Sequence, residues 1–151
     1  MILTGAGLSA ASGVPTFRGA GGFWTKSYEG VEDPTEILTQ SFFMKQPESF
    51  WDWHFDFEEL MHSKEPNDGH HAIQDYMSWQ AGRAESSAML VTQNIDDLHT
   101  LAMPGEPRAG KVEGTEKYAF TNGVIELHGN TRYMRCPSFC GQLWFNAPSR
   151  T

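Results

Sequence analysis

The sequence predicts an α/β protein built on a parallel sheet. Three short apolar runs, at residues 1–3, 88–92 and 124–127, have the length and composition of buried strands. A long segment between the first two runs, about 34–82, carries apolar residues at the three- and four-residue spacing of helices. Strands that alternate with helical segments are typical of parallel sheets, because the return to a parallel strand needs a crossover.

The first strand leads directly into Gly5-Ala6-Gly7-Leu8-Ser9-Ala10, which has the G-x-G-x-x-G/A pattern of phosphate-binding turns. Gly5 permits a tight turn, and Gly7 lets backbone amides approach a pyrophosphate. The small Ala10 allows the strand and the following helix to pack closely. The hexamer alone is equally compatible with an ordinary tight turn.

The segment after this turn cannot continue as the long helix of a dehydrogenase. Its helix-breaking residues are Gly13, Pro15, Gly19, Gly21 and Gly22. We therefore expect an irregular loop, which carries Phe17 and Arg18 and covers a bound nucleotide.

Helices are expected in the segment that follows. Asp33-Pro34 is typical of a helix start, with the aspartate as the cap. A longer helix is expected from about Pro47 to His62, and its many aromatic residues favour a core or pocket wall over a cofactor motif. Asn67 can cap a further helix from about Asp68 to Gln80.

Polar residues follow the second and third strands directly. They are Gln93, Asn94, Asp96 and His128. Ligands of open α/β sheets bind at the carboxyl ends of the strands, so we expect these side chains in a binding site. Between the two strands, residues 103–122 are rich in Gly, Pro, Glu and Lys and predict an exposed loop or a small insertion.

The composition narrows the class of protein. With 39% apolar residues, and no apolar run long enough to cross a bilayer, the 151-residue chain is expected to be a soluble domain without a membrane partner. A net charge of −8 argues against direct nucleic-acid binding and would suit a basic peptide. Because the chain shows no secretory signal, its two cysteines are interpreted as metal ligands or free thiols rather than as a disulfide. We therefore expect an intracellular location, and the sequence does not indicate which compartment.

Three motifs in this order resemble the sirtuins, the NAD-dependent protein lysine deacylases. They are GAGLSAASGVPTFR at 5–18, TQNIDDLH at 92–99 and ELHG at 126–129. The resemblance covers nearly the whole chain. It implies that the chain is the amino-terminal part of a sirtuin catalytic domain. Residues 1–130 would form a Rossmann-like NAD-binding portion with a helical insertion at about 34–82, and residues 131–151 the start of a small zinc-binding module.

The resemblance also implies chemistry, namely transfer of the acyl group of a lysine to ADP-ribose with release of nicotinamide. His128 would be the general base, since an imidazole exchanges protons near neutral pH. Asn94 and Gln93 would hold the reacting ribose, and Asp96 the nicotinamide carboxamide. The other implied NAD-binding residues are Gly5, Ala6, Gly7, Ser9, Phe17 and Arg18. The implied partners are acylated lysines of proteins, with histones among the candidates.

Cys136 and Cys140 would be two of the four ligands of a structural zinc. Their C-x3-C spacing departs from the C-x2-C that the family often shows, and the family's second cysteine pair is not in this chain. Two thiolates do not complete a tetrahedral site, so weak zinc binding and free thiols both stay open.

Thr16 and the glycine-rich residues 19–24 resemble class III sirtuins, some of which remove succinyl, malonyl or glutaryl groups. Those enzymes bind the acidic acyl chain with a Tyr-x-x-Arg pair, and the matching positions here are His54 and Phe57. Because the arginine is absent, an acidic acyl chain would lose its charge-assisted hydrogen bonds. We therefore expect an acetyl or longer neutral acyl group.

Other functions remain compatible with the motifs. One is a fragment that binds NAD without turnover, and another is mono-ADP-ribosyl transfer, which uses the same activated ribose. An NAD-dependent oxidoreductase is disfavoured by the broken helix after the glycine turn.

Overall fold

The computed structural model describes residues 1–18, 21–23, 33–83, 88–103, 124–135 and 143–145. Two of the sequence predictions lie outside this part of the chain. They are the loop expected at 103–122, apart from its first residue, and the two candidate zinc ligands, Cys136 and Cys140.

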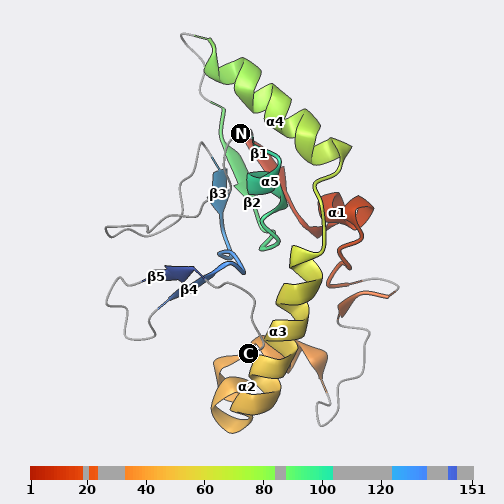
Figure 1. The fold of residues 1–151 in the computed structure, drawn as a ribbon, viewed down its shortest axis with the longest axis vertical. Helices are drawn as coiled ribbons and strands as arrows, with labels where there is room; N and C mark the ends of the chain where they lie inside the picture. Colours follow the sequence, from red (N-terminus) through yellow and green to blue (C-terminus); the bar gives the residue numbers. More distant parts are fainter. Residues whose placement is uncertain (19–20, 24–32, 84–87, 104–123, 136–142, 146–151) are drawn as a thin grey trace.

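A three-stranded parallel sheet forms the centre of the fold (Figure 1). Its strands are β1 (Ile2–Thr4), β2 (Leu90–Thr92) and β3 (Val124–Glu126), in that order across the sheet. The last residues of the strands are paired in register, Thr4 with Thr92 and Thr92 with Glu126. All three predicted strands are confirmed, and they all end at one edge of the sheet.

The glycine turn feeds only a short helical segment, as predicted. Helix α1 (Ala6–Ser9) continues into one 3-10 turn, Ala10–Ser12, and the segment ends at Gly13. Gly13 has a φ of 81°, a left-handed conformation that favours glycine and stops the helix.

Within the described residues, four further helical elements lie between Gly13 and β2. They are a 3-10 helix (Pro34–Leu38), α2 (Gln40–Lys45), α3 (Pro47–His62) and α4 (Asp68–Ala81). The side chain of Asp33 accepts a hydrogen bond from the Thr35 amide at 2.9 Å, which confirms the predicted cap. The predicted limits of α3 are confirmed, and α4 extends one residue beyond its predicted end. Helix α2 was not predicted.

Two apolar clusters hold these elements together. The larger one surrounds the inner face of α3 and contains Val14, Phe23, Ile37, Phe42, Trp53, Phe57, Met61 and Leu98. The smaller one packs Met77 of α4 against Leu90 and Val124 of the sheet. Burying one such side chain contributes about 1.5–3 kcal/mol to the free energy of unfolding. The helices and the sheet therefore stabilise each other.

Asn67 connects α4 to the glycine motif. Its side-chain oxygen accepts from the Gly69 amide and caps α4, as the sequence predicts. Its Nδ2 donates to the Leu8 carbonyl and the Ser12 hydroxyl, each at 2.9 Å. One side chain therefore fixes a helix end and the segment after the turn together.

The carboxyl-terminal described residues form a second, two-stranded antiparallel sheet. Its strands are β4 (Tyr133–Arg135), which was not predicted, and β5 (Leu143–Phe145). The four-residue α5 (Leu98–Leu101) was also not predicted. Within the described ranges, no helix is both long and apolar enough to span a membrane.

Candidate active site

A buried cluster of polar side chains joins the turn after β1 to the loop after β2. Ser9 is fully buried, and its hydroxyl donates to Asp96 Oδ2 at 2.6 Å. The Asn94 Nδ2 donates to the Ser9 hydroxyl at 3.0 Å and to the Gly5 carbonyl at 3.2 Å. Residues that the sequence placed in two motifs 85 or more positions apart are therefore in direct contact.

The glycine turn leaves open space where a ligand could approach. A Cβ atom placed on Gly5 or Gly7 would meet nothing within 4 Å. The Gly5 backbone is extended, with a φ of −152°, so its lack of a side chain matters for space rather than for backbone conformation. The turn therefore fits an anion that comes close to its backbone, as a dinucleotide pyrophosphate does.

His128 lies at the same edge of the sheet and is exposed. Its Nδ1 is 3.0 Å from the Gln93 carbonyl oxygen. Because a carbonyl only accepts, Nδ1 carries the hydrogen in this contact and Nε2 of the neutral ring has a lone pair. This tautomer is the one that a general base needs.

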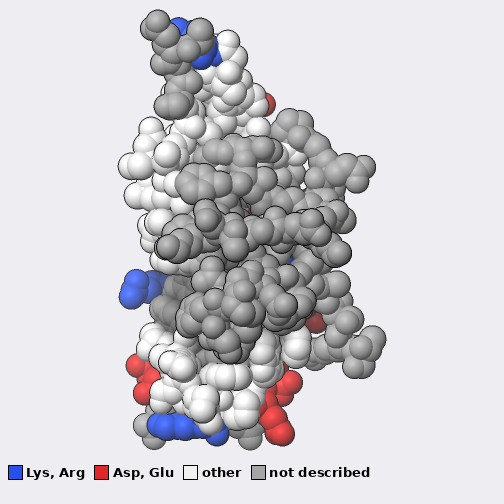
Figure 2. Space-filling view, turned by 90° about the vertical axis from the view of Figure 1, so that its left-hand side faces the viewer, with Lys and Arg blue, Asp and Glu red and all other residues white. Residues whose placement is uncertain are grey.

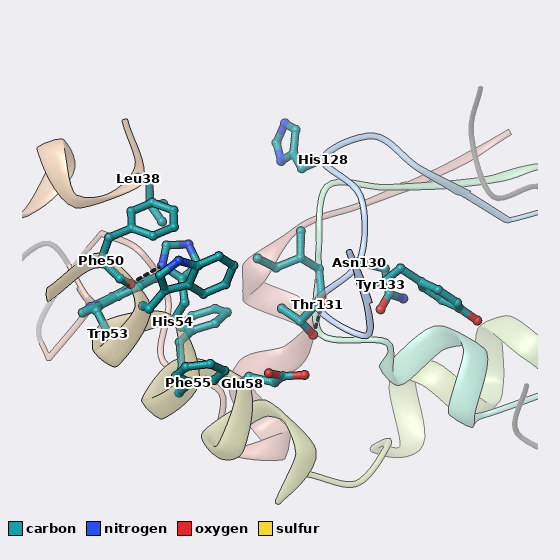
Figure 3. Close-up of a pocket in the computed structure, with 13 residues that line it drawn as sticks. Leu38, Phe50, Trp53, His54, Phe55, Glu58, His128, Asn130, Thr131 and Tyr133 are labelled. Carbon is teal, nitrogen blue, oxygen red and sulfur yellow. Dashed lines mark hydrogen bonds between the residues drawn. The ribbon is translucent and has the colours of Figure 1, made fainter. Parts of the chain in front are cut away.

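A cavity of about 280 Å³ lies between α3 and the segment that follows β3. Figure 3 shows the aromatic side chains of α3 on one side and His128, Asn130, Thr131 and Tyr133 on the other. The lining residues are Leu38, Phe50, Trp51, Trp53, His54, Phe55, Phe57, Glu58, Ile95, His128, Asn130, Thr131 and Tyr133.

The charges around this cavity are unfavourable to an anion. Among the described residues that line it, none is Lys or Arg, while Glu58 contributes a carboxylate and is 4% exposed. His54 stacks on Phe50 with the ring centroids 3.9 Å apart, and its Nδ1 donates to the Phe50 carbonyl. Burial lowers the pKa of His54, which keeps the ring uncharged at neutral pH.

The outer face of α3 is acidic. Glu48, Asp52, Asp56 and Glu59 are exposed along it at three- and four-residue spacing. In Figure 2, acidic and basic side chains both lie toward the lower end of the molecule, the end that holds α2 and the start of α3.

The structure does not bring every predicted NAD-binding residue into the polar cluster. Phe17 is half-buried, 5.7 Å from the Phe23 ring, and packs against the large apolar cluster. Arg18 is exposed, and its carbonyl accepts a hydrogen bond from the Thr16 hydroxyl. Ala6 is half-buried beside the glycine turn.

Sequence reasoning missed several residues of the site. Glu58 was missed because a single acidic residue among the apolar positions of α3 gives no signal of a site in the sequence. Asp97 lies within the second motif, and Asn130 and Thr131 follow the third motif by one and two residues; this proximity is the signal that could have found them. His99, the last residue of the second motif, is buried and bonded through Nε2 to the Thr4 hydroxyl at 2.9 Å.

Comparisons with known proteins agree with this arrangement. The sequence pattern of the Sir2 family matches residues 5–147. The chain is 38% identical over 148 residues to the NAD-dependent protein deacylase sirtuin-5, mitochondrial, of Danio rerio, covering 98% of the chain and 41% of that relative. It is 41% identical over 138 residues to an NAD-dependent protein deacylase of Daphnia pulex, covering 90% of the chain and 41% of the relative.

Solved structures give the same picture. A mutant Sir2 homologue in complex with ADP-ribose matches with a TM-score of 0.73 and 33% identity, over 99% of this chain and 49% of that one. A Sir2 homologue with NAD matches with a TM-score of 0.65 and 33% identity, over 96% and 46%. A Sir2 protein with a deacetylated peptide matches with a TM-score of 0.63 and 29% identity, over 95% and 47%. The chain thus spans about 40% of the length of these two curated relatives.

The buried His99 predicts a loss of stability in acid. Burial, and secondarily the neighbouring His70, lowers its pKa from 6.5 to about 4. Between these values the unfolded chain binds more protons than the folded one, so stability present above pH 6.5 is lost as the pH falls toward 4. His99→Gln can keep the hydrogen bond to Thr4 without titrating. We therefore expect this variant to lose about 1–3 kcal/mol less of its free energy of unfolding in acid than the wild type.

Urea unfolding at pH 7.5, 5.5 and 4.5 measures this difference, with the exposed His71→Gln as the matched control. Equal pH dependence in wild type and His99→Gln would contradict the prediction.

Proposed function

The chain belongs to the Sir2 family, and from this premise we propose that it is the amino-terminal part of an NAD-dependent protein lysine deacylase. One observation carries the proposal. The open glycine turn and His128, whose Nε2 is free to accept a proton, lie at one edge of the sheet beside an apolar cavity. Relatives named NAD-dependent protein deacylase, similar over almost the whole chain, support it.

We assign NAD to the edge formed by the turn after β1 and the loop after β2. Bound NAD would supply the ribose that receives the acyl group. Gly5 and Gly7 would face its phosphates, because the space over the glycines suits an anion, and the buried Ser9 would hold Asn94 and Asp96 in the site through its hydrogen bonds. Ala6, Phe17 and Arg18 belong to the same proposed site as neighbours of the turn. Asp96 accepts hydrogen bonds from the Ser9 hydroxyl and the Leu98 amide, and its carboxylate has further lone pairs. One of these would accept a hydrogen bond from the nicotinamide carboxamide.

The catalytic groups of the proposal are His128 and Asn94. His128 Nε2 would accept a proton from a hydroxyl of the reacting ribose, while the Gln93 carbonyl holds Nδ1–H and so fixes the tautomer. Asn94 donates both hydrogens of its amide inside the protein, which leaves its Oδ1 to accept from the ribose, with Gln93 nearby. The aromatic wall of α3 would keep water from the acylated lysine.

The acyl group that suits the cavity is neutral. An acidic acyl chain would enter a space whose described lining residues include no lysine or arginine, next to the Glu58 carboxylate and an uncharged His54. Like charges repel most strongly where water is excluded. We therefore propose acetyl or a longer neutral acyl group, on a lysine within a basic peptide that the acidic face of α3 attracts, histone tails included.

The second sheet is proposed as the start of a zinc-binding module that occupies residues 131–151, after the NAD-binding portion at 1–130. Arg135 at the end of β4 pairs with Leu143 at the start of β5, so Cys136 and Cys140 belong to the connection between two paired strands. A zinc ion there would take these thiolates as two of its four ligands. An intracellular location is also proposed, supported by relatives whose names include the word mitochondrial.

A second function is favoured by one observation. The open glycine turn and the polar cluster beside it would bind NAD whether or not turnover follows. We keep this nucleotide-binding role as the alternative outcome of the first experiment below.

The complete protein that carries this chain is expected to convert NAD and an acetyl-lysine peptide into nicotinamide and deacetylated peptide, measured by mass spectrometry. His128→Ala should lower the rate by about 10²- to 10⁴-fold, the usual contribution of a general base. His71→Ala on the exposed face of α4 is the matched control and should leave the rate unchanged. NAD binding without nicotinamide release would favour the alternative role, and full activity of His128→Ala would exclude the proposed base.

The acyl preference has its own test, a comparison of acetyl-, myristoyl- and succinyl-lysine peptides. The wild type is expected to use the two neutral groups and to discriminate against succinyl. Glu58→Gln keeps the shape of the side chain and removes its charge, so it should raise the ratio of succinyl to acetyl kcat/KM by about 10-fold, as for one charge repulsion of roughly 1.4 kcal/mol. Glu59→Gln, exposed on the same helix, controls for the loss of a negative charge. A wild-type preference for succinyl would overturn the acyl assignment.

A further inference from the structure

We propose that Asp97, Asn130 and Arg132 form a latch that sets the position of His128. They are positioning residues, because their side chains bond to one another and to the segment that carries the histidine; Asn130 also lines the cavity. The inference rests on the proposed function in that it assigns the latch to the deacylation site. The latch itself is a feature of the fold and can be tested without turnover.

The His128 segment is tied to the loop after β2 on both sides. Before the histidine, the Leu127 amide donates to the Thr92 carbonyl at 2.9 Å. After it, the Thr131 amide and hydroxyl donate to the Ile95 carbonyl at 3.1 and 3.0 Å. His128 therefore lies on a short bridge whose two ends are fixed to the neighbouring loop.

The latch lies at the far end of this bridge. Asn130 Nδ2 donates to Asp97 Oδ1 at 2.8 Å and to Glu126 Oε1 at 2.7 Å, and its own oxygen accepts from the Arg132 amide at 2.8 Å. Arg132 Nε forms an ion pair with the other oxygen of Asp97. The Asp97 side chain is 7% exposed and that of Arg132 is 21% exposed, so water screens the pair weakly.

The backbone of Asp97 supports a special role for this residue. With a φ of 65°, Asp97 is the single non-glycine residue with positive φ among those that the structure describes. Such a conformation is costly for a residue with a Cβ and persists where surrounding contacts determine it. Here it places the carboxylate between Asn130 and Arg132.

The position of His128 depends on the latch, because the imidazole ring itself makes few contacts. The ring is exposed, and within the described residues its one hydrogen bond is the contact of Nδ1 with the Gln93 carbonyl. That contact selects the tautomer but leaves the ring free to move with its backbone. A shift of about 1 Å between reacting groups can lower a rate by roughly 10²-fold, so a rigid bridge matters for proton transfer.

The test uses Arg132→Met, Arg132→Lys and Asp97→Asn in the complete protein. Arg132→Met removes the ion pair and retains the length of the chain, whereas Arg132→Lys restores the charge. Asp97→Asn keeps a side chain that tolerates positive φ and can still accept from Asn130. Arg83→Met, on the exposed end of α4 over the Trp79 ring, is the matched control. Melting temperature and ADP-ribose affinity show whether each variant is folded.

For folded variants the latch predicts a fall in kcat of about 10- to 100-fold for Arg132→Met, with the KM for NAD within about twofold of wild type. Arg132→Lys should recover part of the loss, and Arg83→Met should behave as wild type. Unchanged kcat in Arg132→Met, or a loss carried by KM for NAD, would overturn the latch while leaving the proposed function intact.

Amide hydrogen exchange gives a second readout that requires no activity. In Arg132→Met and Asp97→Asn, exchange at the Thr131 amide should accelerate about 10-fold or more, whereas the Leu127 amide, held by β2, should keep its wild-type rate. Equal rates at Thr131 in wild type and both variants would overturn the latch even if the protein proved to have no deacylase activity. If a variant unfolds, both amides accelerate together, and that outcome also counts against a local latch.

Discussion

The hydrogen bonds of Ser9, Asn94 and Asp96 are the constraint on which the rest of the site depends. A carboxylate that is 4% exposed must have hydrogen-bond partners, and Asp96 has them in the Ser9 hydroxyl and the Leu98 amide. Asn94 extends the cluster to the Gly5 carbonyl. These bonds hold the turn after β1 against the loop after β2, so that the open space over the glycines and the reactive edge of the sheet coincide.

The site has two walls that come from distant parts of the sequence. The aromatic face of α3 supplies one wall, and the residues from His128 to Tyr133 supply the other (Figure 3). The first is rigid because Trp53, Phe57 and Met61 are packed in the core on the same helix. The second is held by polar contacts to the loop after β2.

Much of the fold could be predicted from local sequence, because its signals are local. The spacing of Trp53, Phe57 and Met61 fixed the limits of α3, and Asn67 marked the start of α4 through its cap. The short α5 and β4 carry three or four residues each, too few for a period to be recognised. The motifs brought Ser9 and Asp96 into one predicted site, but the pairing of Asp97 with Arg132 across 35 positions has no local signal. The packing of Phe17 on the core likewise depends on tertiary contacts.

The central claim is that the edge formed by the glycine turn and the loop after β2 is the nucleotide site. The most direct measurement is an NMR titration of the isotope-labelled complete protein with ADP-ribose. The claim predicts that the amide signals of residues 5–9 and 93–96 shift together and saturate at one affinity, while those along α4 stay in place. Saturable shifts confined to α4, or none at the glycine turn, would contradict it.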